Sequence, residues 1–309
     1  MKIVFMGSPQ FAVPVLTRLV EDGYDIQAVY TQPDKPAGRG QTLHISPVKS
    51  FALSMGFAIK QPLTLRDKAV QDELRSLAPD LIVVVAYGLF LPDQILETPR
   101  FGCINVHPSV LPRHRGAAPV VSTLLAGDKW SGVTIMRMDS GWDTGDILSS
   151  SKILIREEDD TESLMEKLSD ISAAMMLEIL PLWTSGLIIP RKQDSDKATY
   201  FKMMKKEDGL IDWSLDASTI RNRVRALQPW PGTFTYLNGR LIKILSCSVI
   251  ENDTVTDKPG TVLLSKHAVD IATGCGLLRL GTIQPEGKKA MAACDYVRGN
   301  GFPTGAVLG

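Results

Sequence analysis

The chain has 309 residues, of which 44% are hydrophobic and 22% are charged, a composition typical of globular proteins and a length sufficient for two domains. Its formal net charge is zero, which argues against a strongly basic nucleic-acid binder. Residues 190–309 nevertheless hold 17 basic and 12 acidic side chains, a weak indication that this half meets a polyanionic partner.

Cysteine spacing and hydropathy bear on the compartment. The four cysteines show no CxxC or zinc-type spacing, so thiols in a reducing compartment are favoured over a disulfide framework, and no metal site is predicted. Residues 1–7 have the pattern of a buried strand rather than of a signal peptide, and no apolar run has the length of a membrane span. We therefore expect a cytoplasmic protein that acts without a membrane.

Residues 1–189 alternate between strand and helix patterns. Strands are predicted at 2–6, 26–31, 58–61, 80–86, 103–107, 133–138 and 147–155, and helices at 9–21, 47–55, 66–76, 117–126 and 160–183. The aliphatic run from Asp80 to Ala86 is typical of a strand covered on both faces. Because Gly7 is followed by Ser8, Pro9 and Gln10, the dinucleotide-binding fingerprint is absent. The pattern of residues 1–189 therefore predicts an α/β domain with a predominantly parallel sheet.

A loop and a linker interrupt these patterns. Residues 32–46 are rich in proline and glycine and include Lys35, Arg39 and His44. A loop this long is either functional or plain solvated surface, and its residues alone do not decide which. Residues 190–207 lack periodicity and are basic, which indicates an interdomain linker.

Residues 208–309 show a different pattern. A helix with three arginines is predicted at 218–227, and Asn238-Gly239 has the composition of a hairpin turn. Short strands are predicted at 233–237, 240–248, 260–265, 268–273 and 277–284. Such a series predicts a small antiparallel barrel, for which an OB-like barrel is one candidate.

The residues best suited to catalysis are Asn105, His107 and Asp143. Alternate residues of a strand share a face, so the amide of Asn105 and the imidazole of His107 should lie side by side. Pro108 should end that strand, which leaves both side chains at its carboxyl end, the usual ligand position in an open α/β sheet. Asp143 lies in a glycine-punctuated turn and should sit on a loop.

These three groups fit acyl transfer to an amine without a covalent intermediate. An imidazole moves protons near neutral pH, an amide stabilises an oxyanion, and a carboxylate orients the imidazole. From position alone, strand-end side chains that merely satisfy backbone groups are an equally good interpretation. Cys103 is an alternative nucleophile, but a buried thiol is favoured there. A metal site from His107, His114 and Asp143 is disfavoured because no further His or Cys cluster accompanies it.

Several segments resemble the folate-dependent formyltransferases, and the resemblance extends over nearly the whole chain. The segments that carry the catalytic residues of this family are NVHPSVLPRHRGAAP and GVTIMRMDSGWDTGDIL. Others resemble the members that formylate initiator methionyl-tRNA, namely KIVFMGSPQFAVPVL, TQPDKPAGRG, VVVAYGLFLP, DGLIDWSLDASTIRNRVRALQPWPGTF and PEGKKAM. The chain departs from the usual family residues at four positions: Pro108, Val110, His114 and Trp142.

The resemblance implies a fold, a reaction and a set of site residues. The fold would be a Rossmann-like domain over residues 1–189, a basic linker over 190–207 and an OB-like, tRNA-binding barrel over 208–309. The reaction would move a formyl group from 10-formyltetrahydrofolate to the α-amine of methionine on initiator tRNA, carried out by a monomer without a metal. Asn105, His107 and Asp143 would take the catalytic positions.

Two further sets of residues follow from the same resemblance. Folate would contact the loop formed by Ser109, Val110, Leu111 and Pro112, and Arg39 would contact the tRNA acceptor stem. Two alternatives stay open. One is a folate-dependent formyltransferase that acts on a small nucleotide or sugar amine, and the other is a non-catalytic RNA-binding protein.

Overall fold

The computed structural model describes residues 1–37, 42–250, 256–299 and 301–309, so Arg39 lies outside the described residues. The chain divides into two compact units, which are described separately. The first comprises Met1–Pro119, Trp130–Leu154 and Met165–Phe201. The second comprises Val120–Lys129, Ile155–Leu164 and Lys202–Gly309.

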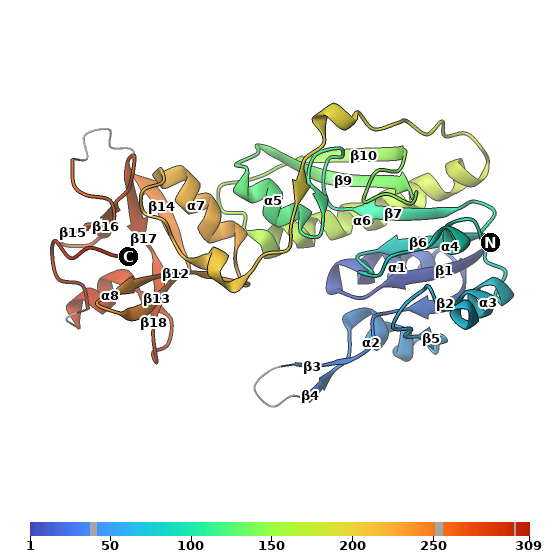
Figure 1. Ribbon diagram of the computed structural model, residues 1–309, viewed down its shortest axis with the longest axis horizontal. Helices are drawn as coiled ribbons and strands as arrows, with labels where there is room; N and C mark the ends of the chain where they lie inside the picture. Colours follow the sequence, from blue (N-terminus) through green and yellow to red (C-terminus); the bar gives the residue numbers. More distant parts are fainter. Residues whose placement is uncertain (38–41, 251–255, 300) are drawn as a thin grey trace. The chain divides into compact units, whose positions relative to one another are not determined.

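The first unit is built on a seven-stranded sheet. Its strands are β1 (Lys2–Gly7), β2 (Asp25–Tyr30), β5 (Ile59–Lys60), β6 (Leu81–Val85), β7 (Cys103–His107), β9 (Trp130–Arg137) and β10 (Ile147–Leu154). Their order is β10-β9-β7-β6-β1-β2-β5 (Figure 1). From β5 to β7 all neighbours are parallel, whereas β9 runs antiparallel to both β7 and β10. The prediction of an α/β domain with a mainly parallel sheet is confirmed.

Helices and short pairings complete this unit. The helices are α1 (Val13–Glu21), α2 (Pro47–Ser54), α3 (Lys68–Ser76), α4 (Asp93–Leu96) and α6 (Thr161–Thr184, which begins in the second unit). The short strands are β3 (Lys35–Ala37), β4 (Thr42–His44), β8 (Arg115–Gly116) and β11 (Tyr200–Phe201). Side-chain caps set two helix starts, because Ser46 accepts from the Lys49 amide and Asp67 from the Ala69 amide.

Burial in the sheet follows the aliphatic patterns of the sequence. Ile3, Val4, Phe5 and Met6 of β1 are fully buried, as is every residue of β6 but Val84, which is nearly so. A parallel strand covered on both faces has this uniform burial. These central strands form the buried middle of the sheet, and β7 pairs with β6 on one side and with β9 on the other.

The second unit is an antiparallel β domain, as predicted. Its strands are β12 (Thr233–Leu237), β13 (Arg240–Ile244), β14 (Cys247–Ile250), β15 (Val262–Leu264), β16 (Val269–Ala272), β17 (Leu277–Leu280), β18 (Thr282–Pro285) and β19 (Met291–Ala292). They form two four-stranded sheets, β12-β13-β18-β19 and β14-β17-β16-β15. The helices α7 (Ala217–Ala226) and α8 (Ala293–Arg298) accompany them, while α5 (Pro119–Leu125) begins in the first unit and continues in this one.

One turn prediction in this unit is confirmed and two strand predictions are wrong. Leu237 pairs with Arg240 across Asn238 and Gly239, which both have positive φ, as a tight hairpin needs. The predicted strands 240–248 and 277–284 are each two strands, because the chain passes from one sheet to the other at Ser246 and Gly281. Apolar residues stand on both sides of each bend, so each pair of strands reads as one continuous strand in the sequence.

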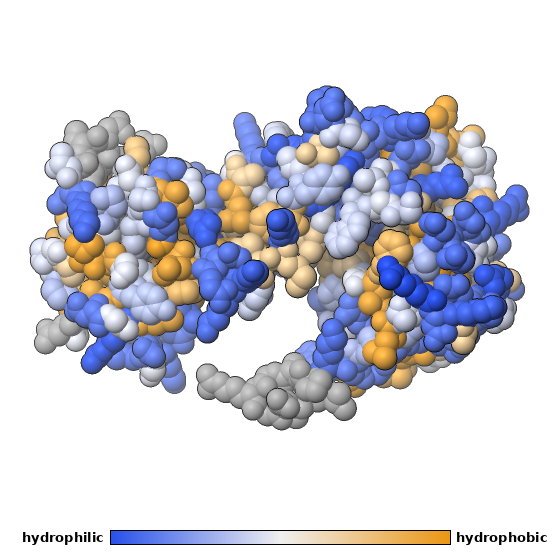
Figure 2. Space-filling model, in the orientation of Figure 1, coloured by the Kyte–Doolittle hydropathy of each residue, from blue (hydrophilic) through white to orange (hydrophobic). Residues whose placement is uncertain are grey.

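Surface polarity matches the composition. Figure 2 shows hydrophilic residues over most of the face in view, with apolar residues in small groups among them. Within the part of the chain that the structure describes, no helix has the length and apolar character needed to cross a membrane.

Candidate active site

Strand β7 presents Asn105 and His107 on one face, as predicted. Asn105 pairs with Met136 of β9, and His107 pairs with Thr134. Asn105 is 8% exposed and His107 is 4% exposed. His107 lies at the end of the strand and is nevertheless buried, because the chain that follows returns to the ring at His114.

The His107 ring lies between a main-chain carbonyl and a carboxylate. Its Nε2 atom is 3.0 Å from the carbonyl oxygen of His114, and its Nδ1 atom is 3.6 Å from Oδ1 of Asp143. A carbonyl oxygen can only accept, so Nε2 carries a proton and donates. The second ring nitrogen, Nδ1, faces the Asp143 carboxylate.

The Asp143 carboxylate is held by a tightly built turn between β9 and β10. Its Oδ2 atom accepts from the Gly116 amide at 2.8 Å, and the residue itself has a φ of 54°. Asp139 accepts from the Gly141 amide and from the Thr144 hydroxyl, which closes the turn. A Cβ on Gly145 would lie 1.8 Å from the Arg137 carbonyl oxygen, so only glycine fits there.

The Asn105 amide is the third polar group of the site. Among the described residues it has no hydrogen-bond partner, although it is almost fully buried. The amide is not fully enclosed by the protein, since 8% of the residue is exposed. It can therefore donate to a ligand that reaches the carboxyl end of β7.

The loop of Ser109 to Pro112 is pinned to strand β9 by one side chain. The Thr134 hydroxyl donates to the Ser109 carbonyl at 2.7 Å and accepts from the Leu111 amide at 3.1 Å. Ser109 and Leu111 are buried, whereas Val110 and Pro112 are partly exposed. Ser109 and Leu111 therefore hold the loop, whereas Val110 and Pro112 are available for contact.

Sequence reasoning missed two residues, Arg115 and Gln193. Arg115 is 2% exposed and donates to the Gln193 side-chain oxygen from Nε at 3.1 Å and from Nη2 at 2.8 Å. The Gln193 amide nitrogen donates in turn to the carbonyls of Asp143 and Gly145. Arg115 stands in the segment that carries the family resemblance, which was the available signal. Gln193 lies in the stretch interpreted as a linker and carried none.

Cys103 lies at the other end of β7 from His107 and is buried, as predicted. Its sulfur lies near the carbonyls of Ile95 and Leu96, and burial raises the pKa of the thiol to about 12. A thiol that stays protonated at neutral pH is a poor nucleophile. No cluster of three or more His, Cys, Asp or Glu side chains suited to a metal is found within the described residues.

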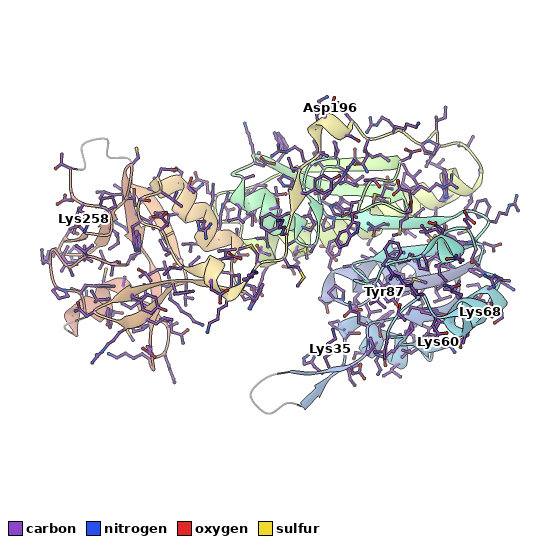
Figure 3. All side chains as sticks on the ribbon, in the orientation of Figure 1. Lys35, Lys60, Lys68, Tyr87, Asp196 and Lys258 are labelled. Atoms are coloured by element: carbon purple, nitrogen blue, oxygen red, sulfur yellow. The ribbon has the colours of Figure 1, made fainter. Side chains whose placement is uncertain are left out.

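The hairpin β3–β4 is anchored at its root by polar contacts. Lys49 forms an ion pair with Asp34 and donates to Gln61 at 2.6 Å. Gln32 accepts from Lys35 at 3.4 Å and donates to the Tyr87 carbonyl at 3.2 Å; Figure 3 labels Lys35 on the hairpin and Tyr87 beyond β6. The root of the hairpin is thereby tied to the turn that follows β6.

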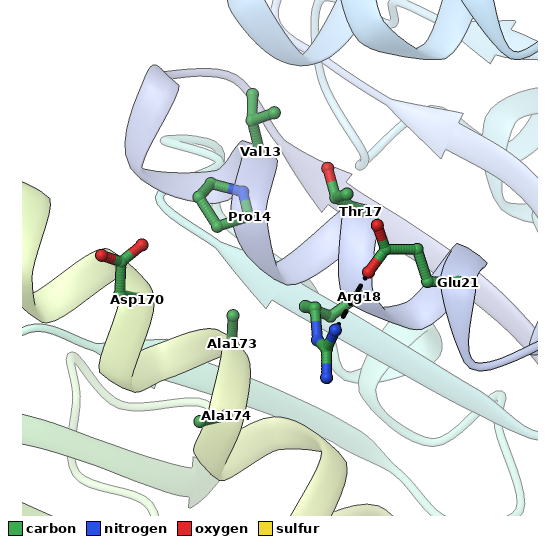
Figure 4. Close-up of a pocket in the computed structure, with 8 residues that line it drawn as sticks. All are labelled: Val13, Pro14, Thr17, Arg18, Glu21, Asp170, Ala173 and Ala174. Atoms are coloured by element: carbon green, nitrogen blue, oxygen red, sulfur yellow. Dashed lines mark hydrogen bonds and ion pairs between the residues drawn. The ribbon is translucent and has the colours of Figure 1, made fainter.

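A shallow groove lies elsewhere on the first unit, between α1 and α6. It has a volume of about 460 Å³ and is shown in Figure 4. Its lining residues are Val13, Pro14, Thr17, Arg18, Glu21, Asp170, Ala173 and Ala174. None of them is a residue that the sequence singled out, and its charged side chains include the exposed pair of Arg18 and Glu21.

The arginines of α7 are engaged within the second unit. Arg223 donates to the Asp208 carbonyl, Arg225 donates to the Arg156 carbonyl at 3.2 Å, and Arg221 lies 3.7 Å from Glu157. These side chains help to hold the unit together. The lysines of the stretch that leads into this unit, Lys202, Lys205 and Lys206, are exposed.

Comparison with known proteins identifies the family of both domains. Residues 1–180 match the family model described as formyl transferase, and residues 203–301 match the formyl transferase C-terminal domain. The solved structure of WlaRD, a sugar 3N-formyl transferase in the presence of dTDP and 5-N-formyl-THF, shares the fold. It has a TM-score of 0.70 and 18% identity, over 94% of this chain and 99% of that one.

Curated relatives match over the full length. A protein of Caldanaerobacter subterraneus subsp. tengcongensis is 45% identical over 100% of both chains. A second, from Dehalococcoides mccartyi strain CBDB1, is 47% identical over 100% of this chain and 99% of its own. Both are named methionyl-tRNA formyltransferase. The chain therefore belongs to the formyl transferase family and, within it, to the methionyl-tRNA formyltransferases.

Proposed function

We propose that this chain transfers the formyl group of 10-formyltetrahydrofolate to the α-amine of methionine on initiator methionyl-tRNA, which gives N-formylmethionyl-tRNA for translation initiation. Formylation of methionyl-tRNA agrees with full-length relatives of that name. The observation that carries the proposed chemistry is the nearly buried amide of Asn105 on the same strand as His107, whose ring faces the Asp143 carboxylate. Asn105, His107 and Asp143 are the proposed catalytic residues.

The proposed reaction is direct attack of the amine on the formyl carbon. Asn105 donates to the oxyanion of the tetrahedral intermediate. The His107–Asp143 pair takes the proton that the amine loses and returns one to N10 of the folate. The new C–N bond forms as the bond from the formyl carbon to N10 breaks, so formylated amine and tetrahydrofolate are the only products.

We place the folate donor on the loop of Ser109, Val110, Leu111 and Pro112. Val110 and Pro112 offer partly exposed apolar surface beside the carboxyl end of β7, whereas Ser109 and Leu111 keep the loop in shape. The family match and the formyl-folate named with the WlaRD structure support this donor. The carboxyl ends of strands in an open α/β sheet are also where such sheets bind ligands.

We assign tRNA binding to Arg39 and to the part of the chain that follows the catalytic domain. The proposed division is a Rossmann-like catalytic domain over 1–189, a basic linker over 190–207 and an OB-like barrel over 208–309. Exposed lysines of the linker would meet phosphates, which position a nucleic acid without reading its sequence. The enzyme would act as a monomer in the cytoplasm, where aminoacylated tRNA is found.

Formyl transfer to three acceptors tests the proposal. Purified protein and 10-formyltetrahydrofolate are combined with charged initiator tRNA, with free methionine or with a nucleotide-linked amino sugar. Product should form efficiently only on the charged tRNA. Equal or better transfer to the amino sugar would establish the small-amine alternative, and transfer to none of them would leave an RNA-binding protein without this activity.

A further inference from the structure

Three consecutive residues, His114 to Gly116, each hold one part of the candidate catalytic pair. The His114 carbonyl accepts from His107, and the Gly116 amide donates to the Asp143 carboxylate. Arg115 lies between them and reaches the backbone of the Asp143 turn through Gln193. The contact through Arg115 depends on the side chains of Arg115 and Gln193, whereas His114 and Gly116 contribute main-chain groups.

Arg115 is a buried cation with uncharged partners. Its Nη1 atom donates to the Tyr200 hydroxyl at 2.6 Å, its guanidinium lies over the Tyr200 ring, and its other contacts are to Gln193. Among the described residues no carboxylate forms an ion pair with it. Burying an uncompensated charge is costly. The neutral Gln193 therefore occupies a position where a carboxylate would offset the buried charge of Arg115 better.

The guanidinium fixes which way the Gln193 amide points. Arginine has donors and no acceptor, so two of its N–H groups must meet the Gln193 oxygen. The amide nitrogen is then turned to the opposite side, where it donates to the Asp143 carbonyl at 2.8 Å and the Gly145 carbonyl at 2.7 Å. Reversing the amide would set oxygen against both carbonyls and nitrogen against the guanidinium.

These two carbonyls flank the strained part of the turn. Asp143 has a φ of 54°, a conformation that non-glycine residues rarely adopt and that surrounding contacts must enforce. We propose that Arg115 and Gln193 are positioning residues that hold the Asp143 turn so that its carboxylate faces His107 during formyl transfer. The inference rests on the proposed function, and neither residue touches the reacting atoms.

The first test is steady-state kinetics on charged initiator tRNA. Gln193→Leu removes both donors from a partly exposed position, and Gln193→Glu keeps the acceptor for Arg115 but sets a carboxylate against the carbonyls. Each should lower kcat about 10- to 100-fold, because misplacing a reacting group by about 1 Å costs this much. The KM for 10-formyltetrahydrofolate should change far less, since the Ser109–Pro112 loop is held separately.

The second test is a double-mutant cycle with Arg115→Met. If the two side chains act as one unit, the Arg115→Met, Gln193→Leu double variant should be no slower than the worse single variant. Trp183→Phe is the matched control, because it removes a side-chain bond to the Phe101 carbonyl just before the opposite end of β7. It should lower the melting temperature without changing kcat.

A third measurement does not depend on activity. Hydrogen exchange at the Gly116 amide reports its bond to the Asp143 carboxylate. Exchange there should be faster in Gln193→Leu than in wild type and unchanged in Trp183→Phe. The exchange test does not need the Arg115→Met variant. It therefore still decides the inference if that buried substitution impairs folding.

Two outcomes overturn the inference: kcat of Gln193→Leu within about twofold of wild type, or losses that multiply in the double variant. Either leaves the proposed function standing as long as the wild-type protein formylates charged initiator tRNA. Failure of the wild type to do so would instead reject the proposed function, and the exchange of the Gly116 amide would still decide whether the pair holds the turn.

Discussion

The carbonyl oxygen of His114 accepts a hydrogen bond from Nε2 of His107 at 3.0 Å. His114 itself has a φ of 61°, so the carbonyl is aimed at the ring by an unusual backbone conformation. The ring therefore has one nitrogen committed to the protein and one directed at Asp143. Proton transfer through this pair is the basis of the first prediction.

His107→Ala and Asp143→Asn should each lower kcat/KM by about 100- to 10,000-fold, the usual effect of losing a general acid or base. Asp143→Asn keeps an oxygen for the Gly116 amide, so the turn should survive. Kinetics with circular dichroism as a folding control make the measurement. Near-normal turnover in either folded variant would remove the pair from the mechanism.

Asn105→Leu should separate activity from stability. Removing the oxyanion donor should cost about 100- to 1,000-fold in kcat. Because the amide has no partner among the described residues, replacing it with an apolar side chain of similar size should leave the free energy of unfolding unchanged or raise it. Urea denaturation measures this. A loss of stability above about 1 kcal/mol would show that the amide is paired in the protein.

Cys103→Ser should keep most of the activity. The pKa of the buried thiol is raised to about 12 by loss of solvation, so the thiolate is scarce at neutral pH. Native protein should accordingly react slowly with iodoacetamide at this position, and mass spectrometry during turnover should show no formyl group on it. A trapped formyl adduct at Cys103 would contradict direct transfer to the amine.

Thr134→Val should affect the formyl donor. It removes both hydrogen bonds that hold the Ser109–Pro112 loop, at a cost of about 1–3 kcal/mol in the free energy of unfolding. The KM for 10-formyltetrahydrofolate should rise more than the KM for charged tRNA. Thr233→Val is the control, since Thr233 is also buried and donates to a carbonyl, that of Ile244, in the second unit. A larger effect on tRNA would argue against folate at this loop.

Arg39→Ala should lower turnover on initiator tRNA more than it lowers binding of a folate analogue. If Arg39 guides the acceptor end, the substitution should also narrow the preference for initiator over elongator tRNA. Substituting an exposed lysine such as Lys205 should instead weaken all tRNAs alike and flatten the salt dependence by about one contact. Equal losses on both tRNAs would make Arg39 another phosphate contact.

Local patterns in the sequence predicted where the main strands lie along the chain, because burial on both faces leaves a visible aliphatic run. Strand β6 and the alternation in β7 are examples, and they placed Asn105 and His107 on one face correctly. The hairpin β3–β4 was missed, since its residues read only as a proline- and glycine-rich loop. The short strand β11 was missed as well, because two residues carry no periodicity.

What the sequence determined by itself was the class of fold, the family and the side chains suited to acyl transfer, since these depend on residue type and local spacing. Tertiary structure decided how the side chains are held. The contacts of His107 with His114, and of Gln193 with Asp143, join residues whose pairing follows from turns and from a chain that returns over the sheet. Hydrogen bonds between a side chain and a distant main-chain carbonyl have no signature in residue type, because every residue offers the same carbonyl.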